Sequence, residues 1–92
     1  MSNPAVTVLM PAFNAGRFIA ASIRSVLAQD FEDFELLVID DGSTDGTAAV
    51  IENFRDKRIR LLRNETNCGL VETLNKGLRE ARGTWVARQD AD

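Results

Sequence analysis

The chain has 92 residues, of which 45% are hydrophobic and 27% are charged, and its formal net charge is −3. This length allows one domain with a modest core, the composition is that of a globular protein, and the acidic balance argues against a nucleic-acid partner, which needs a basic face. Because histidine is absent and Cys68 is the only cysteine, a Cys/His zinc site and a histidine-based catalytic triad are excluded, and any bound metal must have oxygen ligands.

The N-terminal part predicts a strand followed by a helix. Residues 1–10 contain neither a basic region nor a long apolar stretch, so we expect no signal peptide and no membrane span, and we expect the cytoplasm as the compartment. The apolar run AVTVLM at 5–10 predicts a buried strand that Pro11 terminates, before the loop PAFNAG. A helix is predicted over 17–29, with an apolar stripe formed by Ile19, Ile23, Val26 and Leu27.

A second strand, FELLVID at 34–40, is almost continuously apolar, which is typical of a parallel strand covered on both faces. It ends on two adjacent carboxylates, Asp40 and Asp41. Because their charges repel each other, we expect hydrogen-bond donors or a cation to bind there. A second helix is predicted to start near residue 45. The residues that favour a helix N-terminus are Ser43, Thr44 and Asp45. Helical spacing follows at Thr47, Val50, Ile51 and Phe54.

The remaining residues predict a third strand, a third helix and a fourth strand. RIRLLR at 58–63 alternates polar and apolar residues, as in a strand near a sheet edge. The loop NETNCG ends in Gly69, which suits a positive φ, and Gly83 is expected at the C′ position of the third helix. TWVAR at 84–88 is predicted as a strand with Trp85 in the core. The buried stripe predicted for the third helix consists of Val71, Leu74, Leu78 and Ala81.

The alternation of strands and helices predicts parallel strands joined by right-handed crossovers. In such sheets ligands bind beyond the carboxyl ends of the strands, where PAFN, DDGSTDG and QDAD are expected to meet. There Asp41 can accept hydrogen bonds from the N–H groups of a nucleobase, although an Asx turn or helix N-cap also explains it. Asp90 and Asp92, two residues apart, can share a divalent ion and a sugar hydroxyl, or form a solvated tail. Phe13 can stack on a base or pack into the core.

One further motif competes with this interpretation. The segment DGSTDGTAAVIE at 41–52 has the spacing of an EF-hand calcium loop, in which an entering helix precedes the first ligand. Here a strand-like run precedes it, and Ala48 stands where a branched apolar residue is usual. A dinucleotide fingerprint and a P-loop are both absent from the sequence. The loop positions one, three, five, six and twelve are occupied by Asp41, Ser43, Asp45, Gly46 and Glu52.

Two long segments together resemble one family. VTVLMPAFNAGRFIAASIRSVLAQDFEDFELLVIDDGSTDGT and NCGLVETLNKGLREARGTWVARQDAD resemble the nucleotide-sugar-binding N-terminal half of a family 2 glycosyltransferase with the GT-A fold, over residues 5–92. The resemblance implies that residues 1–92 form a truncated, Rossmann-like three-layer α/β/α domain. Its mainly parallel sheet would have four strands in the order 3-2-1-4. It also implies a nucleotide-diphospho-sugar donor, UDP-linked in many members, with Mn²⁺ or Mg²⁺ on the diphosphate.

The resemblance assigns roles to individual residues. Asp41 would hydrogen-bond the uracil ring, Asp90 would approach the ribose, and Asn67 with Gly69 would shape the site. The implied nucleotide-binding residues are Pro11, Ala12, Phe13, Asp41, Asn67 and Asp90, and the implied metal ligand is Asp92.

The resemblance also predicts what this chain lacks. In the family the acceptor site and the general base lie downstream, so we expect no catalytic residue here and no efficient turnover by the chain alone. An exposed sheet edge predicts self-association, and the intact enzyme is expected in the cytoplasm or at the inner face of the membrane, with an unknown acceptor. The alternatives are a fold module that binds no ligand, or the calcium module described above.

Overall fold

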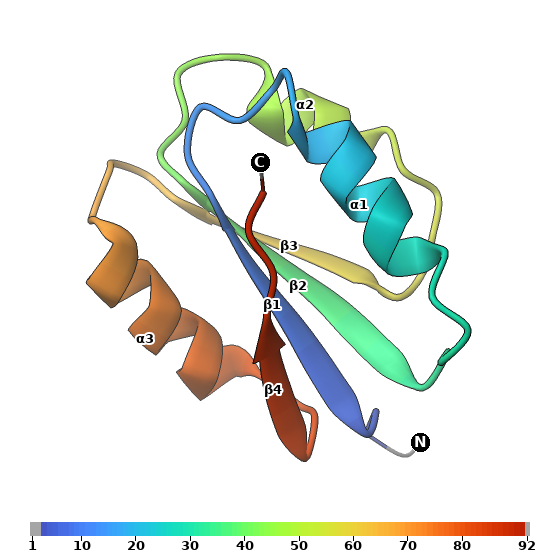
Figure 1. Cartoon of the computed structure of the whole chain (residues 1–92). Helices are drawn as coiled ribbons and strands as arrows, with labels where there is room; N and C mark the ends of the chain where they lie inside the picture. The colour runs from blue at the N-terminus through green and yellow to red at the C-terminus, as the bar shows by residue number, and fades with distance from the viewer. Residues whose placement is uncertain (1–2, 92) are drawn as a thin grey trace.

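A computed structural model of the chain describes residues 3–91 and shows a four-stranded sheet with helices on both faces (Figure 1). The strands are β1 (Val6–Ala12), β2 (Phe34–Asp41), β3 (Ile59–Asn64) and β4 (Trp85–Arg88). The helices are α1 (Ile19–Leu27), α2 (Thr47–Glu52) and α3 (Leu70–Glu80). The strand order is β3-β2-β1-β4 and every pairing is parallel, which confirms the predicted topology. None of the helices formed by residues 3–91 is long and apolar enough to cross a membrane.

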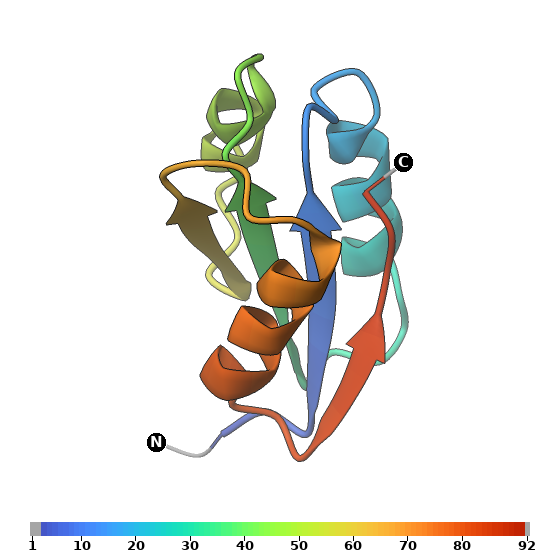
Figure 2. The ribbon, with the colours of Figure 1, turned by 90° about the vertical axis from the view of Figure 1, so that its left-hand side faces the viewer.

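Strand β2 is buried along its whole length because its side chains alternate between two cores. Leu36 and Val38 belong to the larger core, which α1 and α2 cover. Leu37 and Ile39 join Leu9 in a smaller core on the other face, beneath α3. The two views agree that α1 and α2 lie on one face of the sheet and α3 on the other (Figures 1 and 2). The near-continuous apolar character of this strand thus predicted its environment correctly.

Pro11 does not terminate the first strand, contrary to the prediction, because β1 runs on to Ala12. The carbonyl groups of Ala5 and Leu9 accept hydrogen bonds from the β4 side, so alternate backbone groups of β1 face that strand. The pairing of β1 with β4 ends at Leu9, two residues before Pro11. The missing N–H of Pro11 therefore points to a position that β4 no longer occupies, while the pairing with β2 continues.

The predicted buried face of α3 is wrong in part. Val71 and Leu78 are 71% and 57% exposed, whereas the buried residues of this helix are Thr73 and Gly77. A Cβ atom at Gly77 would lie 2.4 Å from a side-chain atom of Leu9, so the helix backbone lies directly against the sheet. The hydrophobic pattern could not reveal this close approach, because it depends on the absence of a side chain.

Trp85 was predicted to lie in the core but is 71% exposed. It begins β4, which among the strands of the described residues 3–91 pairs with β1 alone and has all four residues exposed. A short apolar run at the end of a chain does not show whether its strand is central or lies at an edge. For RIRLLR the alternating pattern did indicate an edge strand, and β3 lies at the opposite edge of the sheet, as predicted.

Element boundaries differ from the prediction by one or two residues, which is the usual uncertainty. Helix α1 is shorter than 17–29, and α2 begins at Thr47, with Gly46 rather than a side-chain cap before it. Gly69 has the expected positive φ of 93°. Gly83 is not a C′ residue of α3: its N–H donates to Thr7 Oγ1 at 2.9 Å, and a Cβ atom there would lie 2.4 Å from the backbone nitrogen of Thr7.

The turn before β3 makes stability depend on pH. The Asp56 carboxylate accepts hydrogen bonds from Arg58 Nε at 3.0 Å, Arg58 Nη2 at 2.7 Å and the Arg58 N–H at 2.9 Å. The side-chain bonds and then the backbone bond hold the pKa of Asp56 at about 2, below its ordinary value of 3.8. A carboxylate with a depressed folded pKa stabilises the fold above its unfolded pKa, and this stabilisation disappears as the pH falls through the folded value.

We expect the thermal midpoint to fall as the pH is lowered from about 4 to about 2, and to fall less steeply in Asp56→Asn. The control is Asp30→Asn, which removes an exposed carboxylate in another loop. Circular dichroism melts at half-unit steps of pH measure this. Equal pH profiles for wild type and Asp56→Asn would contradict the assigned role of the turn.

Candidate functional site

The adjacent carboxylates at the end of β2 diverge, because successive side chains of a strand point to opposite faces. Asp40 is fully buried, and its Oδ1 accepts a hydrogen bond from the Ser43 N–H at 3.0 Å. Arg63 Nε lies 3.3 Å from Asp40 Oδ2, close enough for an ion pair but not aligned for a hydrogen bond, so Oδ2 has no hydrogen-bond partner among residues 3–91. The two charges are thus separated, and Arg63, a residue of the chain itself rather than a bound ligand, offsets the charge of Asp40.

Asp41 holds the loop that precedes α3. Its Oδ1 accepts hydrogen bonds from Asn64 Nδ2 and the Cys68 N–H, each at 2.8 Å, and its Oδ2 accepts one from the Gly69 N–H at 3.0 Å. Burial raises the pKa of Asp41, but these bonds and a contribution from Thr73 outweigh burial and lower it. Asp41 is therefore neither an Asx turn nor an N-cap of its own helix; it is an ionised anchor for a different segment.

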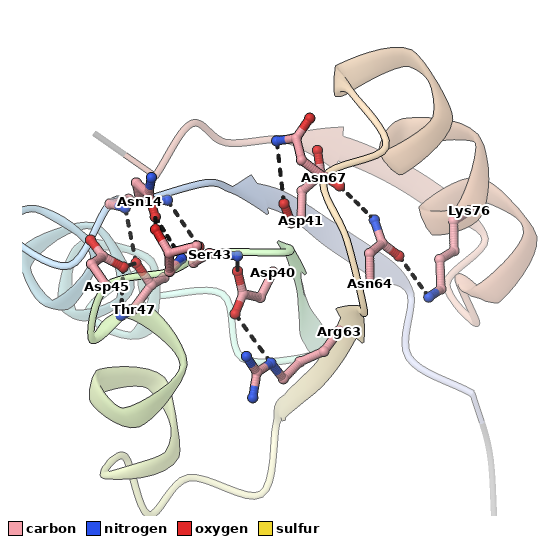
Figure 3. Close-up of polar contacts among 12 residues, drawn as sticks. Asn14, Asp40, Asp41, Ser43, Asp45, Thr47, Arg63, Asn64, Asn67 and Lys76 are labelled. Atoms are coloured by element: carbon pink, nitrogen blue, oxygen red, sulfur yellow. Dashed lines mark hydrogen bonds and ion pairs between the residues drawn. The ribbon is translucent and has the colours of Figure 1, made fainter.

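The loops after β1 and β2 are joined by polar contacts that the sequence did not predict (Figure 3). Asn14 has a left-handed φ of 49°, its N–H donates to Ser43 Oγ at 2.9 Å, and its Oδ1 accepts from the Thr44 N–H at 2.9 Å. Asp45 accepts from the Thr47 N–H at 2.9 Å and from the Thr47 hydroxyl. The bonds of Asn14 fix the turn that carries Phe13. Asparagine tolerates the left-handed conformation better than most residues, so Asn14 itself was the sequence signal for this turn.

The segment after β4 is held in place at Ala91. Ala91 is buried in the larger core, and its carbonyl oxygen accepts a hydrogen bond from Ser22 Oγ at 2.7 Å. Asp90 remains exposed and lies 3.3 Å from Arg88 Nε. Residues 89–91 therefore run alongside α1, near the carboxyl ends of the strands (Figure 2).

These features surround one pocket of about 470 Å³. All the nucleotide-binding residues predicted from the sequence line it: Pro11, Ala12, Phe13, Asp41, Asn67 and Asp90. Asp92, the predicted metal ligand, lies outside the described residues. Gly69, which the resemblance implied to shape the site, also lines the pocket. The lining residues without an individual prediction are Asn14, Ala15, Phe18, Leu70, Thr73, Arg88 and Ala91. Phe18 and Arg88 carried no signal of their own in the sequence, since both occur in elements that the pattern assigned to structure alone.

The calcium-loop alternative is wrong. An EF-hand needs a helix before its first ligand, whereas strand β2 leads directly into Asp41. The carboxylate of Asp41 points to the loop before α3, and Asp45 binds Thr47 instead. Among residues 3–91, no three acidic, cysteine or histidine side chains come together as a metal cage.

The chain matches known proteins in both sequence and structure. The family model "Glycosyl transferase family 2" matches residues 7–92. The chain is 42% identical to the Escherichia coli UDP-Glc:alpha-D-GlcNAc-diphosphoundecaprenol beta-1,3-glucosyltransferase WfgD, over the whole chain and 36% of WfgD. The chain thus spans about a third of the length of this curated relative.

Two solved structures share the fold over the whole chain. The mannosyltransferase PcManGT from Pyrobaculum calidifontis, in complex with GDP-Man and Mn²⁺, has a TM-score of 0.89 and 32% identity, and the chain covers 28% of it. S. aureus TarS 1-349 in complex with UDP-GlcNAc has a TM-score of 0.89 and 33% identity, and the chain covers 27% of it. The fold is the Rossmann-like GT-A type. Since the family model covers nearly the whole chain, the chain belongs to glycosyl transferase family 2.

Proposed function

We propose that residues 1–92 form the nucleotide-sugar-binding half of a GT-A domain, which binds a UDP-linked sugar donor together with Mn²⁺ or Mg²⁺. The observation that carries this proposal is the single pocket shared by the turn after β1, the end of β2 and the segment after β4. The names of WfgD and of the TarS complex, which include UDP-Glc and UDP-GlcNAc, support a uridine nucleotide. Parallel sheets bind nucleotides at this end of their strands.

The lining residues offer complementary contacts to a nucleotide. Phe13 is 49% exposed, so its ring is free to stack on a base. Asp41 is ionised and lines the pocket, where an acceptor oxygen selects a ligand N–H. Asn67 Nδ2 donates to the Asp41 carbonyl oxygen at 3.4 Å, which fixes this side chain at the pocket wall. The exposed carboxylate of Asp90, which also lines the pocket, would bind the ribose hydroxyls.

The oxygen atoms available as metal ligands at this site fit a hard divalent cation. Asp90 presents an exposed carboxylate at the mouth of the pocket, and Asp92 follows two residues later in the sequence. Carboxylate and phosphate oxygens are the ligands that Mg²⁺ and Mn²⁺ prefer. Asp92 would hold the metal, which would supply charge neutralisation at the leaving diphosphate. The role of this chain's residues is to bind and orient the donor.

In the intact enzyme the bound sugar would be transferred to an acceptor, and the chain alone would be inactive. Related proteins are about three times as long, so positioning of the acceptor and general-base catalysis are assigned to a part outside this chain. The proposed compartment is the cytoplasm, where the exposed thiol of Cys68 stays reduced. The competing proposal, a fold module without a ligand, is favoured by one observation: both oxygens of Asp41 already accept internal hydrogen bonds.

Calorimetry distinguishes the two proposals. We expect UDP to bind wild type in a Mn²⁺-dependent way, with a dissociation constant near millimolar or below, and Asp92→Ala to abolish the dependence on metal. Glu52→Ala removes an exposed carboxylate from α2 and is the control that leaves binding unchanged. Absence of heat with UDP and Mn²⁺ up to millimolar concentration would support the module without a ligand.

We also propose that the chain associates with a second copy of itself through β4. Trp85 and Val86 are 71% and 42% exposed, and the outer edge of β4 pairs with no strand among residues 3–91. Open edges with apolar side chains pair with other strands. Light scattering is expected to show a mass that rises with concentration, and Val86→Lys is expected to keep the chain monomeric. A monomeric wild type across the series would contradict this interface.

A further inference from the structure

Three elements contribute to a chain of hydrogen bonds behind Asp41. Lys76 Nζ, from α3, donates to Asn64 Oδ1 at 2.9 Å. Asn64, the last residue of β3, donates from Nδ2 to Asp41 Oδ1 at 2.8 Å and to Thr73 Oγ1 at 3.2 Å. Figure 3 shows Lys76, Asn64 and Asp41 in this order, leading from the helix to the end of β2.

The chemistry of lysine sets the orientation of the amide. An ammonium group has only donors, so it can accept nothing from the Asn64 amide and must face its oxygen. The amide nitrogen then points to Asp41, which has only acceptors when ionised. Without Lys76, only the bonds to Asp41 and Thr73 would orient the Asn64 amide, and its oxygen would lose its donor.

This arrangement also decides which oxygen of Asp41 is available to a ligand. Oδ1 accepts two hydrogen bonds, from Asn64 and Cys68, whereas Oδ2 accepts one, from Gly69. A carboxylate oxygen has about two lone-pair sites, so Oδ2 keeps acceptor capacity and Oδ1 does not. Asp41 lines the pocket. Gly69, which donates to Asp41, and Thr73, which accepts from Asn64, line it as well.

We propose that Lys76 and Asn64 are positioning residues that hold the Asp41 carboxylate with Oδ2 available to an N–H donor of the bound nucleotide. This inference rests on the proposed function and deepens it. It assigns a role in binding to two residues that do not line the pocket themselves. Two other cations near this end of the sheet have carboxylate partners of their own: Arg63 pairs with Asp40 on the opposite face, and Arg88 pairs with Asp90. Lys76 is therefore the cation coupled to Asp41 through an amide.

The test uses the full 92-residue chain and two readouts. The first is the pKa of Asp41, followed through its carboxyl carbon by nuclear magnetic resonance without nucleotide, and the second is the dissociation constant of UDP with Mn²⁺. In Lys76→Met we expect a higher pKa for Asp41 and about fivefold weaker binding of UDP, the equivalent of one hydrogen bond. Asn64→Asp places a second carboxylate against Asp41, so its effect is expected to be larger in both readouts.

Two controls separate positioning from general effects. Lys76→Arg keeps a cationic donor and is expected to restore both readouts to within about twofold of wild type. Lys57→Met removes one positive charge at the opposite end of the sheet, and is expected to change neither. A melting curve for each variant verifies that it is folded.

The outcomes distinguish this inference from the proposed function. If wild type binds UDP and Lys76→Met matches it in both readouts, the positioning role is overturned. If wild type fails to bind UDP while the pKa of Asp41 still rises in Lys76→Met, the proposed function fails, but Lys76 and Asn64 still hold the Asp41 carboxylate in position. If neither binding nor a change in pKa is seen, both are overturned.

Discussion

Replacing Gly42 with alanine is expected to lower the free energy of unfolding by about 3 kcal/mol, the sum of two separate costs. Gly42 has a φ of 72°, a left-handed conformation that costs an L-residue about 1–2 kcal/mol. A Cβ atom there would lie 2.5 Å from the carbonyl carbon of Thr66 and 2.6 Å from the Asn67 nitrogen, which are backbone atoms. The loop that Asp41 anchors would have to move away.

Other glycines of the chain separate these two costs. Gly69→Ala tests the conformational cost alone, because φ is 93° and nothing lies within 4 Å of the added Cβ. Gly83→Ala tests the backbone clash alone. Gly46→Ala has neither and is the control, with an expected change within about 0.5 kcal/mol. Urea denaturation measures the series, and a Gly42→Ala variant no less stable than Gly69→Ala would show that the close approach at Thr66 is absent.

Removing the carboxylate of Asp41 is expected to damage both stability and binding. Asp41→Ala leaves the N–H groups of Cys68 and Gly69 without their acceptor, and the Asn64 amide keeps only Thr73 Oγ1. A fully buried unsatisfied donor costs about 1–3 kcal/mol, and these bonds are part-buried. Water from the adjacent pocket offsets part of this, so we expect a loss of about 3 kcal/mol and no detectable binding of UDP. Asp41→Asn keeps one oxygen and is expected to lose less stability.

Asp90→Ala is the matched control, because its carboxylate is exposed at the same pocket. It is expected to weaken UDP binding with less than about 0.5 kcal/mol change in stability. Denaturant melts and calorimetry on the three variants measure this. Normal stability in Asp41→Ala would contradict the anchoring role assigned to this carboxylate.

The lowered pKa of Asp41 gives this prediction a dependence on pH. Because the folded pKa lies below the ordinary 3.8, the ionised carboxylate stabilises the fold above that pH, and the stabilisation is lost as the pH falls through the folded value. Wild type and Asp41→Asn are therefore expected to differ most in stability near neutral pH, and their stabilities are expected to converge in acid. A constant difference down to acid pH would show that the charge of Asp41 contributes nothing.

The pattern of the sequence predicted parallel strands joined by crossovers, and the family resemblance supplied the strand order 3-2-1-4. FELLVID reads as a strand covered on both faces, and β2 is buried throughout. The parallel order then requires that loops after β1, β2 and β4 lie at one end of the sheet, and the predicted site residues found among 3–91 line one pocket there. This arrangement follows from topology alone, without knowledge of any side-chain contact.

What the sequence could not predict depends on contacts between distant segments. The burial of Gly77 rather than Val71 or Leu78 in α3 follows from the packing of the helix backbone on Leu9. The bond from Lys76 to Asn64 joins α3 to the end of β3, which no local pattern records. Edge position likewise belongs to the whole sheet, which is why the exposure of Trp85 was predicted wrongly.

A titration of the ¹⁵N-labelled chain with UDP and Mn²⁺, followed residue by residue in amide spectra, tests the central claim most directly. The shared pocket predicts that the largest shifts occur at the amides of Phe13, Asp41, Asn67 and Asp90. Residues of the cavity at the opposite end of the sheet, such as Lys57 and Arg82, are predicted to stay unchanged. Shifts concentrated at that opposite end, or none at millimolar UDP, would contradict a nucleotide site at the carboxyl ends of the strands.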